Sequence, residues 1–188
     1  MSPFKLAVPA IGVTAILSTW GGVAISDYLP APKTVTQYIQ VEKPEEKYPD
    51  LIREIAPKYG VPLEVVAVLI QKEHDDTRYP YRFEPGQMAR AQRLVKNESQ
   101  ARLAASSYCP LQVMGWHAVE KGDHPLDLLK PRVCVEYGVS IIAKCLDRWR
   151  GKPASERYQK AFECYNGGAA YGKDAYTKLQ DILLTRLG

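Results

Sequence analysis

Apolar side chains recur at helical spacing along most of the chain, and this pattern predicts a mainly α protein. The stretch 61–72 is nearly all apolar, as expected of a central helix that is buried on most sides. The longer stretch 131–150 places apolar residues three and four positions apart. Further helices are expected over 51–59, 87–95, 155–165 and 173–187. No alternating strand pattern competes with them, apart from a small hairpin near 79–83.

Helix-start and helix-stop residues divide these stretches. Asp50 and Ser155 stand where they can cap the first turns of two helices, and Pro131 stands where it can open the longest one. Gly60 is expected to end the first helix, and Pro62 to lie in the first turn of the next.

The N-terminal stretch 6–25 carries no charged residue and has about the 20 residues that a helix needs to cross a bilayer. Lys5 precedes it and Asp27 follows, which favours an amino terminus inside and the rest of the chain exported. We expect residues 1–26 to form a membrane anchor. A cleavable signal peptide, a weakly hydrophobic anchor that later leaves the membrane, and a buried core helix are the alternatives.

Residues 27–49 contain Pro30, Pro32, Pro44 and Pro49 with charged residues between them, and this composition is typical of an extended, solvated linker. The remaining residues, 50–188, are predicted to form one globular domain. All of the net charge of +4 belongs to this part, because four basic and four acidic side chains balance before it. So small a surplus does not suggest nucleic acid binding, whereas an anionic polymer or a bacterial surface would suit it.

Glu73 is the most informative residue for function, because it follows the buried helix at 61–72 directly. A carboxyl group held where water is scarce has a raised pKa, and it can then act as a general acid near neutral pH. An ordinary solvated residue at a helix end is the alternative.

Three short motifs follow Glu73 at long range: Arg-Phe-Glu-Pro at 82–85, Ser-Tyr-Cys-Pro-Leu-Gln-Val-Met at 107–114, and Tyr-Asn-Gly-Gly at 165–168. In this order they resemble the soluble lytic transglycosylase family of the lysozyme-like superfamily, and its phage-borne branch above all. The resemblance covers 50–188 and implies a goose-type, lysozyme-like helical domain.

The resemblance implies cleavage of the β-1,4 bond between N-acetylmuramic acid and N-acetylglucosamine in peptidoglycan. Glu73 would first protonate the glycosidic oxygen and then accept a proton from the C6 hydroxyl of muramic acid, which gives a 1,6-anhydro product. The implied partners are glycan strands and the membrane, with other virion or secretion-apparatus proteins as further possibilities. The domain would face the periplasm, or the protein would be carried in a virion, and it would need no cofactor.

By the same resemblance, substrate contacts are expected from Gln112, Met114, Tyr108, Tyr165 and Asn166. A Tyr hydroxyl beside the acid could orient it, and amides suit N-acetyl and hydroxyl groups of sugars. Plain alternatives are a loop amide that binds water for the glutamine and a helix C-cap for the Tyr-Asn-Gly-Gly motif.

The residues around these motifs are candidates for support of the site. They are His74, which replaces the family's Ser, together with Glu84 and Ser107. The family's glycine before Leu111 is also replaced here, by the Cys-Pro pair at 109–110, which suggests a different loop path.

Two rival functions remain open at this point. Glu84, Asp75 or Asp76 could activate water across the cleft, at roughly 6.5–9.5 Å from Glu73, in an inverting muramidase. The chain could also be an inactive wall-binding membrane protein that keeps the fold.

An even number of cysteines in an exported domain suggests disulfides. They are Cys109, Cys134, Cys145 and Cys164. Cys109 and Cys164 lie beside motifs of the same expected cleft, so we predict that these two can pair, with free buried thiols as the alternative. Cys134 and Cys145 would lie about 16 Å apart on one helix and cannot pair with each other. No zinc-binding spacing joins the cysteines to His117 or His124, and no metal is expected.

Overall fold

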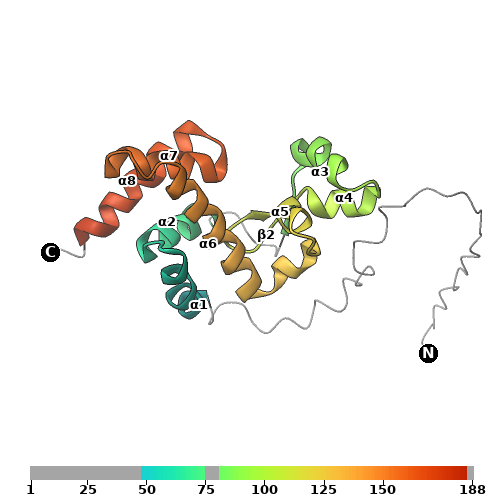
Figure 1. Cartoon of the computed structure of the whole chain (residues 1–188), viewed down its shortest axis with the longest axis horizontal. Helices are drawn as coiled ribbons and strands as arrows, with labels where there is room; N and C mark the ends of the chain where they lie inside the picture. The colour runs from blue at the N-terminus through green and yellow to red at the C-terminus, as the bar shows by residue number, and fades with distance from the viewer. Residues whose placement is uncertain (1–47, 75–80, 186–188) are drawn as a thin grey trace, which may run out of the picture.

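A long helix, α6 (Pro131–Arg148), runs through the middle of the molecule (Figure 1). Pro131 occupies the first turn, where its fixed φ suits a helix and its missing N–H costs nothing. The structure is a computed structural model that describes residues 48–74 and 81–185. Within these residues the fold is mainly helical, which confirms the predicted class.

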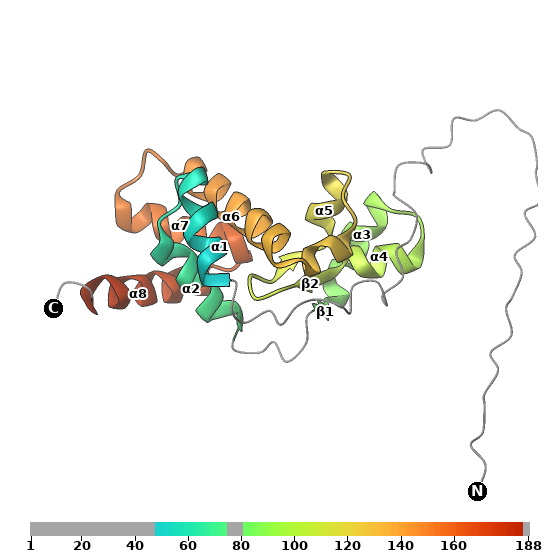
Figure 2. The same cartoon turned by 90° about the horizontal axis from the view of Figure 1, so that it is seen from below.

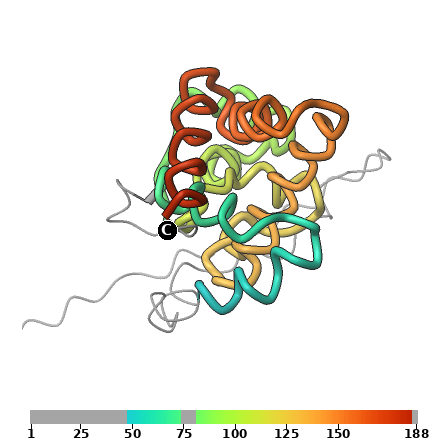
Figure 3. Tube along the Cα trace, turned by 90° about the vertical axis from the view of Figure 1, so that its left-hand side faces the viewer, coloured from blue at the N-terminus to red at the C-terminus, as the bar shows by residue number. Residues whose placement is uncertain are grey.

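Four helices pack around α6 to form the larger lobe. They are α1 (Tyr48–Ile55), α2 (Leu63–His74), α7 (Ala154–Asn166) and α8 (Ala169–Thr185). Figure 2 shows α1 beside α6 and α2 beside α8, and Figure 3 shows α8 on the side that faces the viewer, next to α7. One apolar core joins all of these helices, so the lobe holds together through burial of apolar surface.

The predicted helix boundaries hold to within a few residues, with two corrections. The first helix begins at Tyr48, inside the predicted linker, and Asp50 therefore lies in its first turn, where it pairs with Arg53 at 2.5 Å instead of capping. The last turn is a 3-10 helix, η4 (Ala56–Tyr59), which ends at Gly60 with a left-handed φ of 64°, as predicted. Likewise Ser155 lies within α7, whose first flanking residue is Pro153.

A smaller lobe forms the other end of the molecule. It contains α3 (Met88–Leu94), α4 (Glu98–Ala104) and α5 (Trp116–Glu120), with the 3-10 helices η5 (Pro85–Gln87) and η6 (Pro125–Leu129) at its edges. Its separate buried cluster is largely alanine, since it consists of Ala91, Val95, Ala101, Ala104 and Ala105. Helices α3 and α4 thus bury mainly small side chains, whereas α5 and η6 contribute Ala118, Leu126 and Leu128 to the main core.

A three-stranded antiparallel sheet lies between the lobes in the described part of the chain. Its order is β1 (Tyr81–Phe83), β2 (Ser106–Tyr108), β3 (Val113–Met114). The predicted local hairpin near 79–83 is wrong, because β1 pairs with β2, in the register Tyr81 to Tyr108. A tight hairpin instead joins β2 and β3.

The predicted anchor at 1–26 lies outside the described residues, as does the linker up to residue 47. Among the residues that the structure describes, no helix is both long and apolar enough to cross a membrane.

Candidate functional site

A cleft of about 780 Å³ runs between α6 and the sheet and extends along both lobes. Glu73 lines it from α2, Ser107 and Gln112 from the sheet region, and Tyr165 and Asn166 from the end of α7. The structure therefore brings together, around one cleft, most of the residues that the sequence had singled out at distant positions.

Glu73 reaches the cleft because α2 is anchored in the core behind it. Val65, Val66 and Leu69 are at most 1% exposed, and they fix the helix so that its last turn meets the cleft. His74 ends the helix, but its side chain is not among those described, and Asp75 and Asp76 lie outside the described residues. The role predicted for His74 and the rival roles of the two aspartates stay predictions.

Burial raises the pKa of the Glu73 carboxyl above its ordinary value. Tyr171, Asn166 and the cations Arg82 and Lys72 act in the opposite direction, because they favour the carboxylate, but burial is the larger effect. The Asn166 side-chain amide donates to Glu73 Oε1 over 3.5 Å, which is long for a hydrogen bond. Glu73 is thus a carboxyl group that holds its proton to a higher pH than an exposed glutamate does.

Tyr171, near the start of α8, is a neighbour of Glu73 that sequence reasoning missed. Its buried hydroxyl has no hydrogen bond of regular geometry among the described residues, yet it interacts with the Glu73 carboxyl. Burial and the negative charge of Glu73 together raise the pKa of Tyr171. Its position one short turn after the Tyr-Asn-Gly-Gly motif was the signal that could have identified it.

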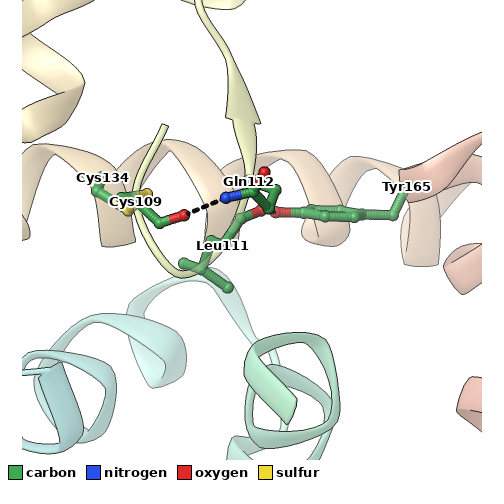
Figure 4. The surroundings of a disulfide bond; sticks show 5 residues. All are labelled: Cys109, Leu111, Gln112, Cys134 and Tyr165. Atoms are coloured by element: carbon green, nitrogen blue, oxygen red, sulfur yellow. Dashed lines mark hydrogen bonds between the residues drawn. A yellow bond between two sulfur atoms is a disulfide. The ribbon is translucent and has the colours of Figure 1, made fainter. Parts of the chain in front are cut away.

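Tyr165 plays a different part from the one predicted. Its hydroxyl donates to the carbonyl oxygen of Leu111 at 2.8 Å, so it does not orient Glu73 by a hydrogen bond (Figure 4). The bond ties the end of α7 to the turn between β2 and β3. Tyr165 therefore fixes the distance between two walls of the cleft.

The turn at 109–112 has an unusual backbone, with Cys109 at a φ of 58° and Gln112 at 47°. Such left-handed values favour glycine, and Cys109 adopts one near the point where the family pattern has its glycine. The Gln112 side-chain amide donates to the Cys109 carbonyl at 3.0 Å (Figure 4). Its oxygen accepts from the Ser107 hydroxyl at 2.7 Å. Gln112 lines the cleft while both of its polar atoms stabilise the turn.

Ser107 links the turn to the neighbouring strand. Its hydroxyl lies 2.7 Å from Gln112 Oε1 and 3.3 Å from Glu84 Oε1, and since it has one hydrogen it donates to one of them at a time. Glu84 also pairs with Arg82 at 2.6 Å. The supporting roles predicted for Ser107 and Glu84 stay predictions.

The two remaining predicted contact residues behave differently. Met114 is half-buried and lines the cleft. Tyr108 is fully buried, and its hydroxyl donates to the Leu103 carbonyl at 2.9 Å. The prediction that Tyr108 contacts a substrate is therefore wrong, because alternation along β2 turns its side chain into the core.

Two disulfides join the cleft walls to α6, but the predicted pair of Cys109 with Cys164 is wrong. Cys109 pairs with Cys134 (Figure 4), and Cys145 pairs with Cys164. The reason is that α6 passes between the two motifs and presents one cysteine near its start and one near its end. Each motif is thus bonded to its own part of the same helix.

The arrangement can deliver a proton to a bound ligand and accept one back at the same carboxyl. Among the described residues, no group of three or more His, Cys, Asp or Glu side chains is placed to hold a metal ion. Comparisons of this chain with protein-family models, with curated proteins and with solved structures found no match.

Proposed function

We propose that this chain is a peptidoglycan lytic transglycosylase with a lysozyme-like domain. The observation that carries the proposal is Glu73, a carboxyl group with a raised pKa in a cleft long enough for a polymer. A glycosidase needs such a proton donor beside the oxygen of the scissile bond.

In the proposed reaction, Glu73 gives its proton to the glycosidic oxygen as the bond from that oxygen to C1 of muramic acid breaks. The Glu73 carboxylate then takes the proton of the C6 hydroxyl, whose oxygen bonds to C1. The sugar ends as a 1,6-anhydro ring, Glu73 regains its proton, and no water is consumed. Asn166 and Tyr171 would steady the carboxylate between the two steps.

The other carboxylates of the cleft support this choice over an inverting muramidase. Glu84 is paired with Arg82 at 2.6 Å, and Glu120 is paired with Arg90 at 3.2 Å. A carboxylate held in an ion pair is a weak base for activating water.

The test is mass spectrometry of the fragments that the full-length chain releases from purified peptidoglycan. Fragments with 1,6-anhydro muramic acid are expected, and Glu73→Gln should abolish their release. Glu136→Gln, which neutralises an exposed carboxylate on α6 outside the cleft, should release them normally. Fragments that have gained a water would instead identify a muramidase. If the wild type releases no fragments, the remaining interpretation is an inactive wall-binding protein.

We also propose that residues 1–26 anchor the enzyme in the bacterial inner membrane, with 48–185 on the periplasmic side. Its biological setting would be a phage, in host lysis or wall penetration, or a secretion apparatus. Recovery of the chain in the membrane fraction, and access of external protease to 48–185 in spheroplasts, test this placement. Recovery in the cytosol would contradict it.

A further inference from the structure

One face of α6 forms a wall of the cleft along most of the length of the helix. Its residues there recur three and four positions apart, as one helical face requires. They are Tyr137, Ser140, Ile141, Lys144, Cys145 and Arg148. The first and last of them are about 16 Å apart along the helix axis.

The cations of the cleft fall into two groups. Arg82 and Arg90 are each paired with a carboxylate of the same cleft. Lys121, Lys144 and Arg148 are exposed, line the cleft, and form no ion pair with any acidic residue that the structure describes. The wall formed by α6 and the end of α5 therefore carries uncompensated positive charge.

Contacts of these three cations place them along the whole wall. Lys121 Nζ lies 4.0 Å from the centroid of the Tyr137 ring, near the start of α6. Arg148, at the other end of the helix, lies with Nη1 3.8 Å from Cys164 Sγ, close in sequence to Asn166. Lys144 lies between them, one turn before Arg148.

The positive charge of this wall also acts on a histidine that lines the cleft. His117, on α5, has a pKa lowered to about 4, first by burial and then by the charges of Arg90, Lys121 and Lys144. Cations from three different helices thus act on one point. Glu120, 3.9 Å from the His117 ring, does not reverse the effect.

A neutral ligand would gain little binding free energy from this positively charged wall. The sugars of a glycan strand offer hydroxyl and N-acetyl groups, which bind amides and carbonyls well and gain little from a lysine. The peptides that branch from the muramic acid residues of peptidoglycan carry free carboxylates. Those carboxylates are the part of the substrate that matches the charge.

We infer that Lys121, Lys144 and Arg148 bind the carboxylates of these peptides, so that the enzyme prefers strands whose peptides carry free carboxylates to strands whose peptide carboxylates are neutralised. The inference rests on the proposed function and names the form of the substrate. An exposed ion pair between one of these cations and a peptide carboxylate would strengthen binding by at most about fivefold. The preference therefore depends on all three cations together.

The test compares two substrates, intact peptidoglycan and peptidoglycan whose peptide carboxylates have been converted into neutral methyl amides. The wild-type chain should cleave the form with free carboxylates about tenfold faster at low salt, below saturation. This ratio should fall as salt screens the charges. In the triple variant Lys121→Gln, Lys144→Gln, Arg148→Gln, the ratio should drop at least fivefold.

A matched variant removes the same charge elsewhere. Arg93, Lys96 and Lys173 are exposed, lie outside the cleft and form no ion pair with a described acidic residue. Their replacement by Gln should leave the substrate ratio unchanged, and thermal unfolding of both variants checks that they fold.

Three outcomes would overturn the inference. They are equal rates of the wild type on the two substrates, an unchanged ratio in the cleft variant, and an equal drop of the ratio in the matched variant, which would reveal a general effect of net charge. Cleavage of neither substrate by the wild type would instead overturn the proposed function, so the two failures are distinguishable.

Discussion

Glu73 is held in an environment that disfavours its charge, and this has a consequence for stability as well as for chemistry. A carboxyl group with a raised folded-state pKa contributes fully at low pH, and the contribution is lost as the pH rises through that pKa. The glutamine side chain of the Glu73→Gln variant is uncharged, so this variant does not lose stability as the pH rises. We therefore predict that this variant melts at an equal or higher temperature than the wild type at pH 7, while its rate of wall cleavage falls by about 10² or more.

The control for this prediction is Glu54, whose situation is the opposite. Hydrogen bonds and charge from Arg132 and Lys58 lower its pKa to about 2, so its contribution is present at neutral pH and is lost as the pH falls towards 2. Glu54→Gln should not raise the melting temperature at pH 7 and should leave cleavage unchanged. Thermal unfolding of the two variants and the wild type at pH 7 and pH 4 measures these changes in melting temperature. A lower melting temperature for Glu73→Gln at pH 7 would show that Glu73 has a structural role instead.

At the scale of elements, α6 is the part to which both halves of the site are attached. The pair Cys109–Cys134 holds the turn that carries Gln112, and Cys145–Cys164 holds the end of α7. They close loops with sequence separations of 25 and 19 residues, and each such bond contributes about 2–4 kcal/mol.

Replacement of either cysteine pair by serine should therefore lower the melting temperature by about 5–15 °C. It should also reduce wall cleavage, and a reductant should do the same to the wild type. Addition of reductant to a variant without both pairs serves as the control, because nothing is then left to reduce. An unaffected wild type under conditions where mass measurement shows both bonds reduced would contradict the prediction.

The contact between α7 and α8 depends on Gly172. A Cβ atom at this position would lie 2.5 Å from the Gln159 carbonyl oxygen and 3.0 Å from the Glu163 backbone nitrogen. Backbone atoms cannot rotate away from this clash as a side chain can. Gly172→Ala should therefore destabilise the fold by about 1–3 kcal/mol. Gly151→Ala is the control, since nothing lies within 4 Å of its Cβ position. Chemical denaturation of the two variants measures the difference, and equal stabilities would show that the helices can separate at no cost.

Periodicity predicted most of the helices, because each buries a face that repeats every three or four residues. It did not predict α4, although Asn97 caps this helix by accepting from the Gln100 N–H at 3.1 Å, and the sequence from Asn97 to Gln100 is a usual helix start. Nor did it predict the pairing of β1 with β2, because the partners are about 25 residues apart and neither strand shows a pattern by itself.

For the whole molecule, the sequence predicted which motifs meet but not how they meet. Glu73 and Asn166 do approach each other, as the resemblance implied. The partners of Tyr165 and of the cysteines depend on where α6 passes, and no local pattern encodes that position. Tyr171 was missed for the same reason, since only the packing of α8 against α2 brings it to Glu73.

The two lobes should differ in their resistance to local unfolding. Helices α3 and α4 of the smaller one rest on a cluster made mostly of alanines, whereas the larger has a core of Val, Leu, Ile and aromatic residues. The disulfides found in the described residues also reinforce only the larger lobe and the turn beside it. Segments with few buried apolar contacts open at a lower free energy than the rest of a fold.

We therefore predict that amide hydrogens of α3 and α4 exchange with solvent at least tenfold faster than those of α6, in hydrogen–deuterium exchange at neutral pH. Because the cleft runs along both lobes, a bound glycan strand would connect them and should slow exchange in α3 and α4 more than in α6. A reduced, alkylated sample is the control for the disulfides, and exchange in α6 should rise there towards that of the smaller lobe. Equal protection of α4 and α6 in the oxidised protein would contradict the prediction, and would mean that the two lobes unfold as one cooperative unit.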